Sequence, residues 1–217
     1  MVIAVDGPGG VGKSTVAGRV ALSVGLPHLD TGSTYRAAGL AALRSGAALD
    51  DSDGIVAALD AVDIRIVEGV VSIDGIDVTK ALRTDEVTKA SSVVATHPEV
   101  RSRIVALQRS WVEDRGGSAV VEGRDIGTVV FPEAPVKVYL TARPEIRAAR
   151  RSGDAEAADK SRDQIAAELA ARDHTDSSRK ASPMKPAEDA VTVDTSDLSI
   201  DEVVERVLAL VEKAGNP

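Results

Sequence analysis

A glycine-rich segment near the start of the chain constrains the fold more than any other feature. It reads GPGGVGKS over residues 7–14. It follows the β-branched run Val2–Val5 and precedes a helical pattern over Lys13–Val24 that stops at Gly25. A strand, a glycine loop and a helix in this order are typical of nucleotide-binding α/β proteins. The sequence therefore predicts an α/β fold with a parallel central sheet.

The same segment satisfies two motifs that predict different chemistry, the phosphate loop G-x-x-x-x-G-K-[ST] and the dinucleotide fingerprint G-x-G-x-x-G. Chance alone produces the fingerprint in roughly one chain in eight at this glycine content, but the longer motif in only roughly one in a hundred. The pair Lys13-Ser14 is therefore the feature that distinguishes the phosphate loop from the dinucleotide fingerprint. Asp30 lies about where the ribose-binding acid of a dinucleotide site would follow, so an NAD-dependent oxidoreductase stays open as an alternative.

Physical chemistry favours the phosphate loop. Its backbone N–H groups and the start of the following helix bind anions, and Lys13 can reach the β- and γ-phosphates. Ser14 would then ligate Mg²⁺, and Glu122, at the end of the apolar run Ala119–Val121, could hold the ion through water. The guanine-reading motif of switch GTPases does not occur in the sequence. Among the phosphate-loop proteins, enzymes that transfer a phosphoryl group to a small molecule therefore remain as candidates.

Composition excludes other classes of protein. The 26 Lys and Arg against 34 Asp and Glu give a net charge of −8, which disfavours a nucleic-acid coat. There is no cysteine, so disulfides, thiolate metal sites and a thiol nucleophile are excluded. The sequence has no apolar stretch long enough to span a membrane. We expect a soluble, cytoplasmic protein with no nucleic-acid or membrane partner. Its core should be mainly aliphatic, and Trp111 should also be buried there.

The rest of the chain alternates helical and strand patterns. Two hairpin signals, Glu68-Gly69 and Asp74-Gly75, separate three short strand patterns and predict a small antiparallel sheet. Ser199 and Glu202 form a capping-box pattern at the start of the last helix. The expected strands are Ile64–Val67, Val71–Ile73, Ile76–Val78, Ala119–Val121, Val136–Leu140 and Ala190–Val193. The expected helices are Ser33–Leu43, Ser52–Leu59, Thr84–Ala95, one with Pro98 in its first turn, and Ser199–Val211.

Basic residues gather in the window 141–186 of this acidic protein. By composition alone, this window is expected to form a solvated pair of helices with mixed charge. Phosphoryl transfer, however, needs cations to bind the phosphates of both substrates, and arginines serve this purpose well. Four arginines are candidates for this role, two of them inside the window, and we expect all four at loop or helix-end positions: Arg36, Arg124, Arg172 and Arg179. The basic residues of the window are Arg143, Arg147, Arg150, Arg151, Lys160, Arg162, Arg172, Arg179, Lys180 and Lys185.

Four stretches together resemble the bacterial cytidylate (CMP) kinases, nearly from end to end. They are Gly7–Thr15, Asp30–Arg36 (DTGSTYR), Glu122–Pro132 (EGRDIGTVVFP), and Arg172-Asp173 with Asp176 and Arg179. The resemblance implies a monomer with one three-layer P-loop domain. Its core would cover about 1–62, 115–143 and 187–217, with a small antiparallel-sheet insert binding the monophosphate at about 63–114 and a helical lid at about 144–186. The implied reaction uses ATP with Mg²⁺ to phosphorylate CMP and dCMP.

The resemblance also implies a role for individual residues. The catalytic residues would be Lys13, Arg124, Arg172 and Arg179. ATP would be bound by Gly7, Pro8, Gly9, Gly10, Val11, Gly12, Lys13, Ser14 and Thr15, and by the lid residues Arg147, Arg150 and Arg151. Arg36, Arg124 and Arg179 would bind the phosphate of CMP, Arg172 and Asp176 its ribose, and Ser92, Arg101 and Asp125 its base. Thr31 stands where some relatives have serine, and Ser14 and Glu122 would serve the metal.

Other functions stay open from the sequence alone. A phosphate-loop kinase could act on a different small hydroxyl or monophosphate acceptor, and a nucleotide sensor would bind without catalysis. The three histidines, His28, His97 and His174, show no spacing typical of metal ligands and are expected at the surface or as capping residues.

Overall fold

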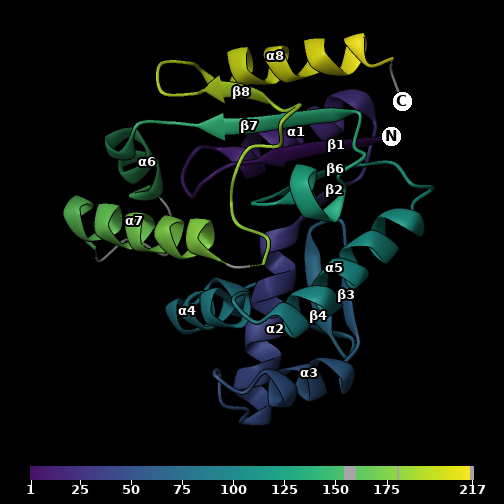
Figure 1. The fold of residues 1–217 in the computed structure, drawn as a ribbon, viewed down its shortest axis with the longest axis vertical. Coiled ribbons are helices and arrows are strands. Elements are labelled where there is room, and N and C mark those ends of the chain that lie inside the picture. Colours follow the sequence, from purple (N-terminus) through teal and green to yellow (C-terminus); the bar gives the residue numbers. More distant parts are fainter. Residues whose placement is uncertain (154–159, 180, 216–217) are drawn as a thin grey trace. The chain divides into compact units, whose positions relative to one another are not determined.

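The computed structural model describes residues 1–153, 160–179 and 181–215. The chain divides into two compact units, which we call the first unit (residues 1–29 and 112–217) and the second unit (residues 30–111) (Figure 1). The functions expected for an insert at about 63–114 and a lid at about 144–186 stay predictions. Lys180 and residues 154–159 of that lid lie outside the described residues.

The first unit is built on a five-stranded sheet with the order β2-β6-β1-β7-β8. Strand β1 is parallel to both β6 and β7, and β7 is parallel to β8. A strand with neighbours on both sides and covered faces needs a nearly continuous apolar sequence, which explains the run Val2–Val5. The strands are β1 (Val2–Asp6), β2 (His28–Asp30), β6 (Ala119–Gly123), β7 (Val136–Thr141) and β8 (Val191–Asp194).

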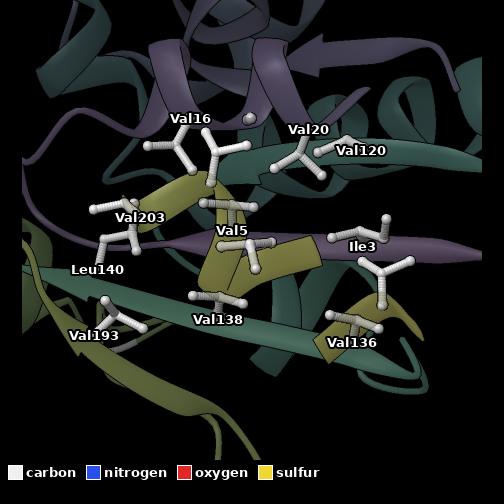
Figure 2. Close-up of a cluster of buried hydrophobic side chains, with 14 of the residues drawn as sticks. Ile3, Val5, Val16, Val20, Val120, Val136, Val138, Leu140, Val193 and Val203 are labelled. Carbon is white, nitrogen blue, oxygen red and sulfur yellow. The ribbon is translucent and has the colours of Figure 1, made fainter. Parts of the chain in front are cut away.

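Helices α1 (Lys13–Val24) and α8 (Ile200–Lys213) cover one face of this sheet. Their valines pack against Ile3 and Val5 of β1, as Figure 2 shows. Asp6 points to the opposite face, because side chains alternate along a strand, and there it contacts the short π-helix η2 (Ile126–Val130). The loops that follow β1 and β6 thus leave the same edge of the sheet.

The first unit also contains a pair of helices, α6 (Pro144–Arg151) and α7 (Arg162–Ser178). Ala148 of α6 and Ile165 of α7 are buried together. Pro at the first turn starts α6, and a capping box formed by Ser161 and Gln164 starts α7. No helix in the described ranges has the length and hydropathy needed to cross a membrane.

The second unit packs four helices and a three-stranded sheet around its own aliphatic core. Glu68-Gly69 and Asp74-Gly75 have positive φ angles, as tight hairpin turns require. Trp111 is buried and its Nε1 donates to the Ile66 carbonyl at 2.8 Å. The elements are α2 (Thr31–Ser45), α3 (Ser52–Asp60), β3 (Ile64–Val67), β4 (Val70–Ile73), β5 (Ile76–Asp77), η1 (Ala81–Arg83), α4 (Asp85–Val94) and α5 (Pro98–Glu113).

The predicted class, an α/β fold with a parallel central sheet and a small antiparallel sheet, is confirmed. The capping box at Ser199 is also present. Three elements were not expected from the sequence, strand β2, the short helix η1 and the π-helix η2. Two arginines lie inside helices rather than at the loop or helix-end positions expected for them, Arg36 in α2 and Arg172 in α7.

Candidate active site

The glycine segment forms the loop between β1 and α1, and we call residues 7–14 the phosphate loop. Gly7, Gly10 and Gly12 have φ angles of 145°, 78° and 94°, which side chains rarely allow. Gly12 is the N-cap of α1 and, among the described residues, no side chain caps this helix and no acid lies in its first turn. The first N–H groups of α1 are therefore left for an anion.

Lys13 begins α1 and folds back over the phosphate loop. Its side chain is largely buried, and its Nζ donates to the Pro8 carbonyl at 2.8 Å. This contact keeps the ammonium group beside the loop backbone, where the phosphates of a bound nucleotide would lie.

Ser14 faces the acidic end of strand β6. Its Oγ lies 3.1 Å from Oε2 of Glu122, whose other oxygen lies 3.2 Å from Nε2 of His28. Glu122 is only 2% exposed, so these contacts fix its carboxylate. A hydroxyl and a carboxylate are oxygen donors of the kind that Mg²⁺ prefers. The described part of the chain contains no cluster of three or more His, Cys, Asp or Glu that could hold a metal ion.

Arg124, just after β6, connects the phosphate loop to the end of α7. Its guanidinium donates to the Gly7 carbonyl at 3.0 Å and to Asp176 at 2.9 Å. Arg179 also pairs with Asp176. Burial alone would raise the pKa of Asp176, but the charges of the surrounding arginines, Arg124, Arg179 and Arg172, bring that pKa below its ordinary value. The phosphate loop therefore lies beside a buried group of guanidinium ions held by one carboxylate.

Two arginines of α6 also contact the backbone of the phosphate loop. Arg147 donates to the Gly9 carbonyl at 2.6 Å and pairs with Asp173, which in turn accepts from the Gly9 N–H at 3.4 Å. Arg150 donates to the Val11 carbonyl at 3.3 Å and to Oγ1 and the carbonyl of Thr195 at 2.8 and 2.6 Å. Arg151 lies in the last turn of the same helix.

The second unit carries four of the predicted substrate-binding residues on three helices. Thr31 is buried in the first turn of α2, and Ser92 of α4 donates to the Thr88 carbonyl at 3.3 Å. Arg101 of α5 is 3% exposed, and its guanidinium lies 5.2 Å from the centre of the Tyr35 ring. These contacts hold the side chains of Arg101 and Ser92 in defined positions.

The fourth of these residues is Arg36 of α2. Its Nε is buried and has no hydrogen-bond partner within the described residues. A buried donor without a partner is unfavourable by about 1–3 kcal/mol, so this position suits an anionic ligand.

The similarity of this chain to known proteins extends over nearly its whole length. The sequence model of the family described as cytidylate kinase matches residues 3–213. The chain belongs to the cytidylate kinase family. Curated cytidylate kinases from Streptomyces avermitilis, Corynebacterium efficiens and Mycobacterium leprae are 46%, 44% and 45% identical to it. Each alignment covers 98% of this chain and, in that order, 93%, 94% and 96% of the relative.

Solved structures with low sequence identity bear on the fold alone. An uncharacterized protein from Eubacterium ventriosum has a TM-score of 0.53 at 11% identity, with 98% of both chains covered. A sugar kinase from Janibacter sp. has a TM-score of 0.50 at 15% identity, with 97% of this chain and 94% of that chain covered.

In this member of the cytidylate kinase family, several residues around the phosphate loop were not among the predicted site residues. Asp173 and Thr195 bind the phosphate loop or the arginines that contact it. His28 was expected at the surface or as a cap, but it contacts the carboxylate of Glu122. Asp6 was not predicted as a site residue, but it is buried and binds the backbone after Asp125.

Gly7 of this cytidylate kinase family member allows a test of the loop geometry. A Cβ at Gly7 would lie 2.2 Å from the Leu140 carbonyl oxygen, far inside van der Waals contact, so Gly7→Ala forces the loop or β7 to move. We expect the free energy of unfolding in urea to fall by about 3 kcal/mol.

Gly25→Ala is the matched control, because Gly25 also has a positive φ of 67° but a Cβ there would meet no atom within 4 Å. It carries backbone strain without the collision, so we expect a loss of about 1 kcal/mol. Equal losses for the two variants would contradict the close approach of Gly7 to β7.

Proposed function

We propose that this chain transfers the γ-phosphoryl group of ATP to CMP, and to dCMP, giving ADP with CDP or dCDP. The observation that carries the proposal is the position of Arg124, which binds both the Gly7 carbonyl of the phosphate loop and the buried carboxylate of Asp176. A cation at this place can neutralise charge where a donor and an acceptor phosphate approach each other.

On the donor side, the phosphate loop binds the phosphates of ATP through its N–H groups and through Lys13. Arg147 and Arg150 supply further positive charge next to this loop, as their contacts with Gly9 and Val11 indicate, and Arg151 is proposed to contribute from the same helix. The other residues proposed to bind ATP are Gly7, Pro8, Gly10, Gly12, Ser14 and Thr15.

A Mg²⁺ ion fits the oxygens of Ser14 and Glu122, the first as a ligand and the second through water. A Mg²⁺ ion held by these two residues would supply positive charge to offset the negative charge that develops on the phosphates during transfer. His28 holds the carboxylate of Glu122 from its far side, which keeps it directed at Ser14.

On the acceptor side, arginines bind the phosphate and polar groups identify the nucleoside. Arg36, Arg124 and Arg179 are proposed for the phosphate, since planar guanidinium groups bind phosphate oxygens in pairs. Arg172 and Asp176 are proposed for the ribose, and Thr31 contributes a hydroxyl. Cytosine has an N4 amino donor and an N3 acceptor, so Asp125 and Ser92 would accept from N4 while Arg101 donates to N3.

No general base is needed in this reaction. The attacking phosphate oxygen of the acceptor is already anionic, so the residues named above act by positioning and charge neutralisation. Lys13 stays with the transferred group, and the arginines of α6 help to exclude water that could hydrolyse ATP.

The test is ADP release with CMP, dCMP, UMP and AMP compared at equal concentration. We expect fast release with CMP and dCMP and at least a hundredfold lower kcat/KM with UMP, because uracil reverses the hydrogen-bonding groups at N3 and position 4. Release with none of these acceptors, despite binding of ATP, would favour a sensor or a kinase for a different acceptor. Binding of NADH, followed by its fluorescence, would favour the oxidoreductase.

Asp30 argues against the oxidoreductase, because its carboxylate does not remain available for a ribose: it caps α2 by accepting from the Gly32 N–H at 2.8 Å.

Asp125→Ala is expected to damage the choice of acceptor. The carboxylate at Asp125 is 4% exposed, and its proposed partner is the N4 amino group that UMP lacks. The ratio of kcat/KM for CMP to that for UMP should fall by at least about tenfold, whereas the Kd of ATP stays within about twofold. Asp53→Ala, which removes an exposed carboxylate on α3, is the control. A ratio unchanged by Asp125→Ala would contradict base reading at this position.

A further inference from the structure

Asp6, at the end of β1, carries a buried carboxylate that the proposed reaction does not use. It is 5% exposed, and its two oxygens accept from the backbone N–H groups of Ile126 and Gly127, both at 2.8 Å. These residues begin the π-helix η2, whose N-cap, Asp125, makes no side-chain capping bond of its own. A carboxylate 120 residues away in the sequence therefore caps η2.

The contact of Asp6 is one of two links between the same parts of the chain. The next residue, Gly7, accepts from the guanidinium of Arg124 at 3.0 Å. Asp125 thus lies between two fixed points, Arg124 bound to Gly7 and the N–H groups of residues 126–127 bound to Asp6. The parallel register, in which Asp6 is opposite Gly123, keeps both links at the ends of neighbouring strands.

The packing around Asp6 is tight. A Cβ on Gly127 would lie 3.5 Å from Oδ2 of Asp6 and 3.1 Å from the side chain of Lys137, so the backbone of η2 fits closely between these two groups. Burial raises the pKa of Asp6 to about 6, although the two backbone N–H groups and Lys13 act in the other direction. Because burying a carboxylate is unfavourable, the two N–H groups that it binds are the contacts that hold it in this position.

We propose that Asp6 is a positioning residue for the acceptor nucleotide, because it fixes the backbone on which the side chains of Arg124 and Asp125 are mounted. This inference rests on the proposed function, in which Arg124 binds the phosphate and Asp125 the base of CMP. The carboxylate of Asp6 acts through the N–H groups of Ile126 and Gly127, with no contact to substrate required.

The test is Asp6→Asn, which keeps the size of the side chain but replaces one acceptor oxygen by an amide donor. Only one of the two backbone N–H groups then keeps its partner, so the start of η2 shifts. We expect kcat/KM for CMP to fall about thirtyfold and the preference for CMP over UMP to fall at least about fivefold, with the Kd of ATP changed by less than about twofold in calorimetry.

Asp51→Asn is the matched control. The carboxylate of Asp51 also caps a helix, by accepting from the Gly54 N–H at 3.1 Å, but it is exposed and belongs to α3. Asparagine caps helices about as well as aspartate, so we expect the kinetic constants of this variant to match those of the unaltered chain.

A purely structural role for Asp6 predicts a different outcome. Asp6→Asn would then melt at a lower temperature but, while folded, would keep its kcat/KM for CMP and its preference over UMP, and this result would overturn the proposal. Equal weakening of ATP and CMP would overturn it too. Gly127→Ala, at an ordinary backbone conformation, presses on the same segment of η2, because its Cβ would lie 3.1 Å from the side chain of Lys137. It therefore tests the positioning of η2 in the same assay if Asp6→Asn does not fold.

The proposed function can fail separately. An unaltered chain that releases no ADP with CMP overturns the proposed function, and the role of Asp6 with it. An active unaltered chain together with an Asp6→Asn variant of unchanged selectivity overturns the role of Asp6 alone.

Discussion

Lys13→Met is expected to lower turnover of ATP and CMP by on the order of a thousandfold, because it removes the positive charge beside the phosphate loop at the point where charge moves between phosphates. The Nζ of Lys13 lies 2.8 Å from the Pro8 carbonyl, so the ammonium group is already held at the loop before any nucleotide binds. Steady-state ADP release with saturating CMP measures the effect.

Methionine is chosen because it keeps most of the length of the buried lysine stem. The variant also loses the hydrogen bond to Pro8, which is worth about 1 kcal/mol, so we expect it to remain folded with a slightly lower melting temperature. Lys213→Met, at the exposed end of α8, controls for the loss of one positive charge. Turnover within a few fold of normal in a folded Lys13→Met variant would contradict the proposed role of Lys13.

Local patterns in the sequence predicted most of the regular elements, since α1 and the antiparallel strands depend on residues close together in the chain. Strand β2 was missed because it has three residues and only Leu29 is apolar, so no alternation is visible. The residue just before this strand is held from outside, by the hydrogen bond from Val120 N–H to the Pro27 carbonyl at 2.9 Å. The π-helix η2 was missed for the same kind of reason, because its cap is Asp6.

The candidate site was predicted as a set of residues but not as a set of contacts. The motif around Lys13 and Ser14 identified the phosphate loop, because it is a short continuous segment. The window 141–186 was expected to be a positive patch, but several of its charges are paired within the structure. Arg143, for example, forms two hydrogen bonds of 2.7 Å with Asp197, which is 54 residues away. Spacing along the chain does not reveal such pairs.

The ion pairs of Asp176 with Arg124 and Arg179 are expected to have a large effect on the free energy of unfolding. Its carboxylate is 2% exposed and lies between the guanidinium groups of Arg124 and Arg179. Asp176→Asn leaves these two cations without the buried anion that offsets their charges. Removing one partner of a buried ion pair is strongly unfavourable, so we expect the free energy of unfolding at pH 7.5, without nucleotide, to fall by about 4 kcal/mol.

The pH dependence separates this charge effect from a change in packing. The pKa of Asp176 is lowered in the folded protein, so below about pH 4 the unfolded chain binds a proton that the folded one does not. The stabilisation is therefore fully present at neutral pH and is lost as the pH falls through the folded pKa, and the gap in urea stability between the unaltered chain and Asp176→Asn should narrow in that range. Asp197→Asn is the control: its pair with Arg143 is exposed, and such pairs contribute less than about 1 kcal/mol. A gap that stays constant from pH 7.5 to pH 3 would mean that the carboxylate acts by its shape, and the arginines would then have to be held in place by other contacts.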